Sequence, residues 1–173
     1  MRIERSMHND IPADQVYEMS TSKAFQEQKC RDAGALSWDV QVTDATTGAT
    51  VKTKRKLPTL GFPSLLRKFV PSGVTSTETI VWAPTRDDGT RTAALSVDFH
   101  GAPASMKGTI TVVPDGATAS TVIIDAEFKA HVPLVAGRVE AFAAPIIMTV
   151  IDSEEQTAKA WITEDKAGNQ PPR

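Results

Sequence analysis

The stretch FAAPIIMTVI, residues 142–151, decides the fold, because it carries no charge and holds a proline, Pro145, near its middle. A membrane, a packed core or a bound apolar molecule would each suit such a segment. The charge-free window runs only from Ala141 to Ile151, whereas a spanning helix needs roughly 20 apolar residues. Acidic residues follow it, which disfavours an anionic membrane surface. We therefore expect no stable membrane insertion.

The residues around this stretch repeat with the period of a helix. Apolar side chains recur every three or four positions, which predicts a long amphipathic helix. They are Val139, Phe142, Ala143, Ile146, Ile147, Val150, Ile151, Ala158, Trp161 and Ile162. Pro145 falls with Arg138, Thr149 and Asp152 on the opposite, solvent side, where a proline bends a helix around what it covers. Residues 166–173 are expected to form a flexible tail.

Before this helix the apolar period changes to two, which predicts β-strands. The expected strands cover residues 2–8, 36–43, 50–57, 74–83, 91–99, 105–113 and 120–130. Turn sequences such as RDDG, HGAP and PDG join the later strands and indicate an antiparallel meander. After the first strand, Pro12 and Ser22 mark the starts of two short helices, and Gly34 ends the second.

One face of the predicted sheet is apolar, and the other is rich in Thr, Ser, Asp, Glu and Lys. Only the apolar face needs a cover, and the C-terminal helix supplies it. The inner face would carry Ile80, Trp82, Leu95, Val97, Phe99, Met106, Ile110, Val112, Val122, Ile124, Ala126 and Phe128. In the second strand, Leu36, Trp38, Val40 and Val42 share one face. The sequence thus predicts one α+β domain, residues 1–165.

Composition limits the partners of this domain. A chain of 173 residues with 40% hydrophobic content is typical of one soluble domain with a sizeable core. Its 19 basic and 21 acidic residues are mixed along the chain, so we expect no nucleic-acid partner. Residues 1–10 are too polar for a signal peptide, and the single cysteine, Cys30, cannot form an internal disulfide. Both features favour the cytoplasm, and the oligomeric state stays open.

The order of one strand, two short helices, six strands and one long helix resembles the START-like, or helix-grip, superfamily (SRPBCC). The segments IPADQVYEMS, residues 11–20, and HVPLVAGRVEAF, residues 131–142, add to the likeness. This superfamily includes lipid-transfer domains, the birch-pollen-allergen group and the aromatic polyketide cyclases. The chain is most similar to an uncharacterised actinobacterial subfamily of it. The resemblance covers residues 1–165 and implies a curved sheet of about seven strands wrapped around the C-terminal helix.

The resemblance also implies a ligand cavity between sheet and helix. Its occupant would be a hydrophobic or amphipathic small molecule, such as a lipid, a sterol-like compound or a polyketide. The expected ligand-binding residues are Arg55, Glu78, Ile80, Trp82, Leu95, Val97, Phe99, Met106, Ile110, Phe128, Phe142, Ile146, Ile147 and Val150. The alternative is that these side chains fill one another's gaps and leave no cavity.

Strand alternation aims three charged residues, Arg5, Arg55 and Glu78, at the apolar face. Charges there are costly unless they are paired. Arg55 and Glu78 lie on sequential strands, so they could form a buried pair or hold the polar end of a ligand. A bulge that turns them outward is the third alternative.

The connection between these two strands, residues 57–73, is too long for a hairpin. Pro63 could start a short helix in it. The candidate residues for a cavity mouth are Phe62, Leu65, Leu66 and Phe69. They would form a flap over the cavity, a plug that seals the barrel end, or a loop that touches a membrane.

The sequence contains no pattern that defines a catalytic site. His8, His100 and His131 have no neighbouring pattern of a triad, and no spacing predicts a metal site. We therefore expect no catalytic residue, no metal and no cofactor, and favour a binding protein over an enzyme. Two alternatives remain: a polyketide cyclase or aromatase, and a protein-interaction or chaperone-regulating module whose apolar groove receives a partner segment.

Overall fold

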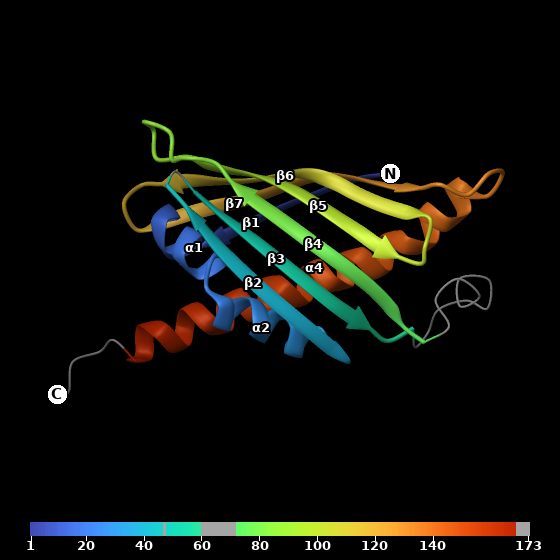
Figure 1. Cartoon of the computed structure of the whole chain (residues 1–173). Helices are drawn as coiled ribbons and strands as arrows, with labels where there is room; N and C mark the ends of the chain where they lie inside the picture. The colour runs from blue at the N-terminus through green and yellow to red at the C-terminus, as the bar shows by residue number, and fades with distance from the viewer. Residues whose placement is uncertain (47, 60–71, 169–173) are drawn as a thin grey trace.

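The computed structural model describes residues 1–46, 48–59 and 72–168. Within them, seven strands form one antiparallel sheet, and a long helix crosses one of its faces (Figure 1). The elements are β1 (Arg2–Asn9), α1 (Ala13–Ser20), α2 (Lys23–Asp32), β2 (Ser37–Ala45), β3 (Gly48–Leu57), β4 (Val74–Trp82), β5 (Arg91–His100), β6 (Ala104–Asp115), β7 (Ala119–Ala130) and α4 (Ala136–Gly168). This arrangement confirms the α+β, helix-grip prediction.

The sheet follows chain order except at β1. Its order is β1-β7-β6-β5-β4-β3-β2, so the first strand lies beside the last, with Ile3 opposite Ala126. The two short helices connect β1 to β2 across the width of the sheet. There α2 packs against α4 and β2, while α1 packs against β6 and β7. The inner face of the sheet is thus covered by α1 over β6 and β7, by α2 over β2, and by α4.

Local sequence signals account for the helix ends. The hydroxyl of Ser22 caps α2 by accepting a hydrogen bond from the backbone N–H of Phe25, and Gly34 follows the helix with a φ of 68°. Pro145 lies inside α4 without ending it. The helix continues to Gly168, which is beyond the position at which the sequence predicts the tail to begin.

The core lies on the inner face of the sheet. One cluster joins Val51, Ile80, Leu95 and Val112 to Val16 of α1, and a second joins Phe128 to Ile151 of α4 and to Ile3. The predicted inner-face residues are all buried or half-buried, as alternation requires. No helix among the described residues combines the length and the apolar character needed to cross a bilayer.

The second strand is less buried than its alternation suggests. Leu36 is exposed and precedes β2, and Trp38 is 37% exposed. Since β2 is an edge strand, α2 covers only part of it, and Val40 alone is fully buried. The guanidinium of Arg31 lies 5.6 Å from the centre of the Trp38 ring and shields it.

The close approach of β6 and β7 depends on Gly108. A Cβ atom at this position would overlap the backbone oxygen of Asp125 and the Cα atom of Ala126. Gly108 belongs to the inner face, between Met106 and Ile110. Only a residue without a side chain therefore permits this close approach of β6 and β7.

Candidate functional site

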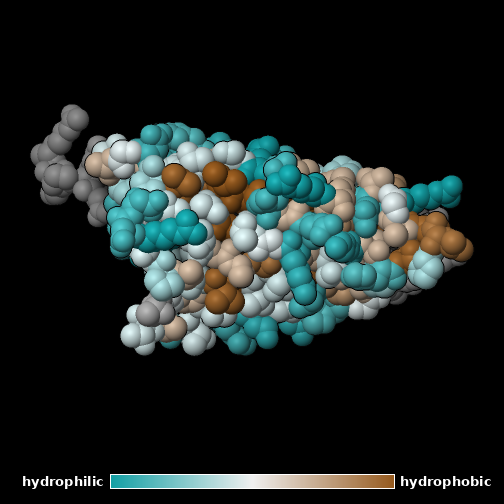
Figure 2. Space-filling model, turned by 90° about the horizontal axis from the view of Figure 1, so that it is seen from above, coloured by the Kyte–Doolittle hydropathy of each residue, from teal (hydrophilic) through white to brown (hydrophobic). Residues whose placement is uncertain are grey.

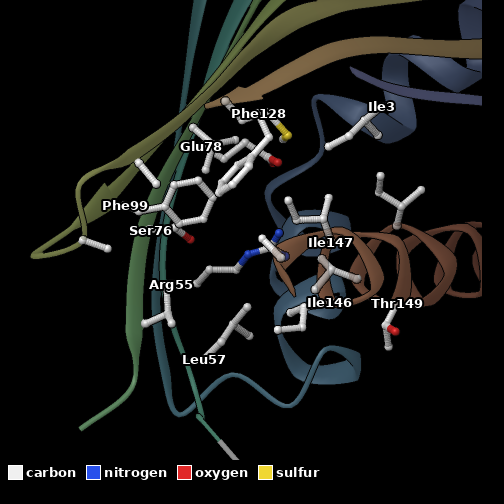
Figure 3. Close-up of a pocket in the computed structure, with 18 of the residues that line it drawn as sticks. Ile3, Arg55, Leu57, Ser76, Glu78, Phe99, Phe128, Ile146, Ile147 and Thr149 are labelled. Carbon is white, nitrogen blue, oxygen red and sulfur yellow. The ribbon is translucent and has the colours of Figure 1, made fainter. Parts of the chain in front are cut away.

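A pocket of about 630 Å³ lies between the inner face of the sheet and α4. This volume is within the range of about 300–1,000 Å³ that is usual for small-molecule sites. Side chains from β3, β4, β5, β6 and β7 form one wall, and Phe142, Ile146, Ile147 and Val150 of α4 form the other. Figure 3 shows Ile146 and Ile147 facing Phe99, Phe128 and Arg55 across the pocket.

The walls are mainly apolar and include one aromatic pair. The rings of Phe99 and Phe128 meet edge to face, with their centres 5.7 Å apart. This contact fixes both rings against the sheet, where they border the pocket beside Glu78 and Ser76 (Figure 3). The described pocket lining therefore includes an edge-to-face aromatic pair.

The structure brings the predicted ligand-binding residues together, with one exception. All of them border the pocket except Trp82. Trp82 lies at the end of β4 that α1 covers, where the ring of Tyr17 packs against it at 5.5 Å. Alternation predicts which face a residue takes but not which helix covers it. A role in ligand binding stays a prediction for all the others.

One end of the pocket is formed by three connections. Leu57 ends β3 and Pro58 follows it, Ala102 and Pro103 join β5 to β6, and Val132 follows β7. Figure 1 shows these connections at the same end of the molecule, and hydrophobic residues are visible at that end in Figure 2. The predicted mouth residues Phe62, Leu65, Leu66 and Phe69 lie outside the described residues.

Four charged side chains border the pocket on β3, β4, α2 and α4: Arg55, Glu78, Lys29 and Glu154, here called the charge cluster. The Nη2 atom of Arg55 donates to Oε1 of Glu154 at 2.9 Å. The Nζ atom of Lys29 lies 2.9 Å from Oε2 of Glu154 and 3.7 Å from Oε1 of Glu78. Two cations and two carboxylates thus meet with no net charge.

Arg55 and Glu78 both point inward, towards the pocket. Both are buried, so no bulge turns them outward. They also do not form a direct pair with each other, since Arg55 lies opposite Ser76 and Glu78 opposite Thr53. Each instead meets a helix residue that the sequence analysis missed. A signal existed: Lys29 follows Phe25 by four positions, and Glu154 follows Ile151 by three, on the buried faces of their helices. The remaining alternative, that Arg55 and Glu78 hold the polar end of a ligand, stays a prediction.

The mutual attraction keeps the cluster ionised. Burial opposes the charge on Glu154, but Lys29 and Arg55 outweigh this effect and lower the pKa of Glu154 to about 2. Burial likewise opposes the charges of Lys29 and Arg55, yet Glu154 and Glu78 raise the pKa of both. The polar end of the pocket is therefore a set of paired ions at neutral pH.

The shifted pKa of Glu154 predicts a specific acid sensitivity. Because the pKa falls from 4.5 to about 2 on folding, this stabilisation is complete above about pH 4.5 and is lost as the pH falls towards 2. Between those values, wild-type protein should lose about 3 kcal/mol more unfolding free energy than Glu154→Gln. Urea denaturation across this range measures it. If the unfolding free energies of the two proteins decrease equally as the pH falls, Glu154 is not held ionised by its neighbours.

The third inward charge, Arg5, makes a separate contact. Its Nη2 atom lies 2.7 Å from Oε2 of Glu155 and 2.9 Å from Oδ1 of Asp152, and its side chain is 35% exposed. This pairing ties the edge strand β1 to α4 outside the pocket lining. Asp152, predicted to face solvent, is a half-buried partner of Arg5 instead.

The histidines lie apart from the pocket lining. His100 shares a 2.7 Å hydrogen bond with the hydroxyl of Thr77, and His131 shares one of 3.1 Å with that of Ser105. His8 lies 3.4 Å from a carboxylate oxygen of Asp10. Across residues 1–46, 48–59 and 72–165, no group of three or more His, Cys, Asp or Glu side chains is arranged to hold a metal.

Comparison with known proteins finds one matching family. The chain matches the model of a family described as a protein of unknown function (DUF2505) over residues 4–162. No curated protein matches the chain.

Several solved structures are similar to this one. The Zhui aromatase/cyclase of Streptomyces sp. R1128 is 11% identical with a TM-score of 0.62, covering 94% of this chain and 95% of that one. A norcoclaurine synthase of Thalictrum flavum is 12% identical with a TM-score of 0.57, covering 96% of each chain. The human StarD13 lipid transfer domain is 14% identical with a TM-score of 0.53, covering 90% and 76%. These likenesses confirm the predicted helix-grip fold.

Proposed function

This chain belongs to the DUF2505 family, and we propose that it binds a hydrophobic or amphipathic small molecule between its sheet and α4. A lipid, a sterol-like compound or a polyketide would fit this description. The observation that carries the proposal is the pocket, which has apolar walls and a compact charge cluster. A packed core contains few voids larger than a water molecule, so a space of about 630 Å³ between the sheet and α4 supports a binding role.

The role of such binding is storage, transport or sensing. Most hydrogen-bonding side chains of the described pocket lining belong to the charge cluster or, like Ser76, lie beside it, and most of the other lining residues are apolar. An apolar molecule would bury its body against Phe99, Phe128 and the α4 side chains, and its polar end would reach the cluster (Figure 3).

A thermal-shift panel tests this function. Fatty acids, sterols, flavonoids and aromatic polyketides should include at least one compound that raises the melting temperature of the protein. At 100 times its dissociation constant, a ligand stabilises the folded state by about 2.7 kcal/mol. If no compound shifts melting, and solvent extracts nothing from protein purified from its own host, the proposal is wrong.

The second candidate function is that of a polyketide cyclase or aromatase. It is favoured by the likeness to the Streptomyces aromatase/cyclase, together with charged groups that could orient a reactive chain inside the pocket. Incubation with a reactive polyketide chain discriminates the two functions. A cyclase changes the distribution of cyclised products, whereas a binding protein leaves the distribution as it is in buffer.

A further inference from the structure

Ser76 and Glu78 border the pocket with hydrogen-bonding capacity that the described residues leave unused. Both belong to β4, two positions apart, and both face inward. Ser76 is only 4% exposed and borders the pocket. Its hydroxyl makes no hydrogen bond within the described part of the chain. Glu78 is 8% exposed, and its nearest cation, Nζ of Lys29, lies at 3.7 Å, which is longer than a hydrogen bond.

Buried polar groups are normally hydrogen-bonded. Two such groups side by side in a cavity are therefore expected to form hydrogen bonds with a molecule that occupies it. Alternate residues of a strand are about 6.7 Å apart, so both side chains can reach one polar group between them. Figure 3 shows Ser76 and Glu78 on the same wall as Phe99 and Phe128. A ligand that meets the two polar groups therefore places its body against the two rings.

The charges nearby restrict the chemistry of that polar group. Lys29 and Arg55 are each paired with Glu154, although the buried Nε of Arg55 has no hydrogen-bond partner among the described residues. A carboxylate ligand would give the cluster three negative charges against two positive ones. An ammonium ligand would add a third positive charge to the same buried cluster. Either ion would lie uncompensated in a buried site, which is strongly unfavourable. The cluster therefore accommodates an uncharged polar group of the ligand.

We propose that Ser76 and Glu78 bind a hydroxyl group of the ligand, so that the ligand is an uncharged alcohol or phenol. The ligand O–H donates to the carboxylate of Glu78, and the hydroxyl of Ser76 donates to the ligand oxygen. Both unused groups then have partners, and no net charge enters the pocket. This inference rests on the proposed binding function and specifies the class of molecule that is bound.

Three matched probes test the inference at pH 7: 2-naphthol, 2-naphthoate and 2-methylnaphthalene, titrated by calorimetry or by their own fluorescence. Wild-type protein should bind 2-naphthol at least about tenfold more tightly than either other probe. Ser76→Ala should weaken 2-naphthol binding by about tenfold and leave 2-methylnaphthalene binding unchanged. Ser96→Ala is the matched control, because Ser96 lies between the inward-facing Leu95 and Val97 and so belongs to the opposite face of the sheet.

The outcomes separate the two proposals. If none of the probes binds, both the proposed function and the inference are contradicted. If 2-naphthol binds no better than the other two, or if Ser76→Ala weakens all three equally, the pocket binds apolar molecules but the hydroxyl inference is wrong. Tightest binding of 2-naphthoate would also overturn it, since the cluster would then accept a carboxylate.

Discussion

Replacing Arg55 with methionine should lower the free energy of unfolding by about 3–5 kcal/mol. Arg55 is 7% exposed, and its guanidinium is 2.9 Å from Glu154. Its removal leaves Lys29 alone against two buried carboxylates, Glu78 and Glu154. An uncompensated buried charge of this kind is what makes the loss large. Urea denaturation of wild-type and variant proteins at pH 7 measures it.

Two further variants make this prediction specific to the charge cluster. Arg55→Met combined with Glu154→Leu should recover much of the loss, since Lys29 and Glu78 remain as a balanced pair. The control Arg5→Met breaks a similar contact between the sheet and α4, but that contact is partly exposed, so its loss should lower the free energy of unfolding much less than Arg55→Met does. If the single substitutions of Arg55 and Glu154 each lower the unfolding free energy only slightly, and the two losses add in the double variant, the cluster is exposed to water and the prediction is wrong.

The second large effect is expected from filling the pocket. Ile147 and Val150 border it from α4 and are only half-buried. A larger side chain that enters empty space costs little, whereas one forced into a packed core costs about 1–3 kcal/mol. At least one of Ile147→Trp and Val150→Phe should therefore keep its melting temperature and lose measurable affinity for any compound that stabilises wild-type protein.

A matched control lies on the same helix. Ile162 of α4 belongs to the packed core cluster and does not border the pocket. Ile162→Trp should lower the melting temperature and leave ligand affinity unchanged in the folded fraction. The pocket proposal is contradicted if Ile147→Trp and Val150→Phe both lower the melting temperature and leave ligand affinity unchanged, as expected for Ile162→Trp. The stretch 142–151 would then contact only core.

Periodicity predicted most of the fold and much of the pocket lining. The alternation along β4 and β5 places Ile80, Leu95 and Val97 on the inner face, and the helical repeat places Ile146 and Ile147 opposite them. These assignments depend only on the geometry of single elements. They are therefore readable from the sequence without knowing how the elements pack.

Packing between elements decided what periodicity missed. Trp82 has the same alternation as Ile80, yet α1 covers it, because β4 extends past the pocket. Arg55 and Glu78 were correctly aimed inward, but their partners come from helices distant in sequence, Lys29 and Glu154. Ser76 was overlooked because a small polar residue on an inner face is common. Its significance depends on the absence of a partner among the described residues.

The most direct test of the binding claim is native mass spectrometry of the protein purified from its own host, compared with the better-folded of the two pocket-filled variants. Wild-type protein should carry a non-covalently bound small molecule that solvent extraction releases, and the pocket-filled variant should have the bare mass of the chain. A bare mass for wild-type protein, or the same bound molecule in both proteins, would contradict the proposal that the space beneath α4 is a ligand site.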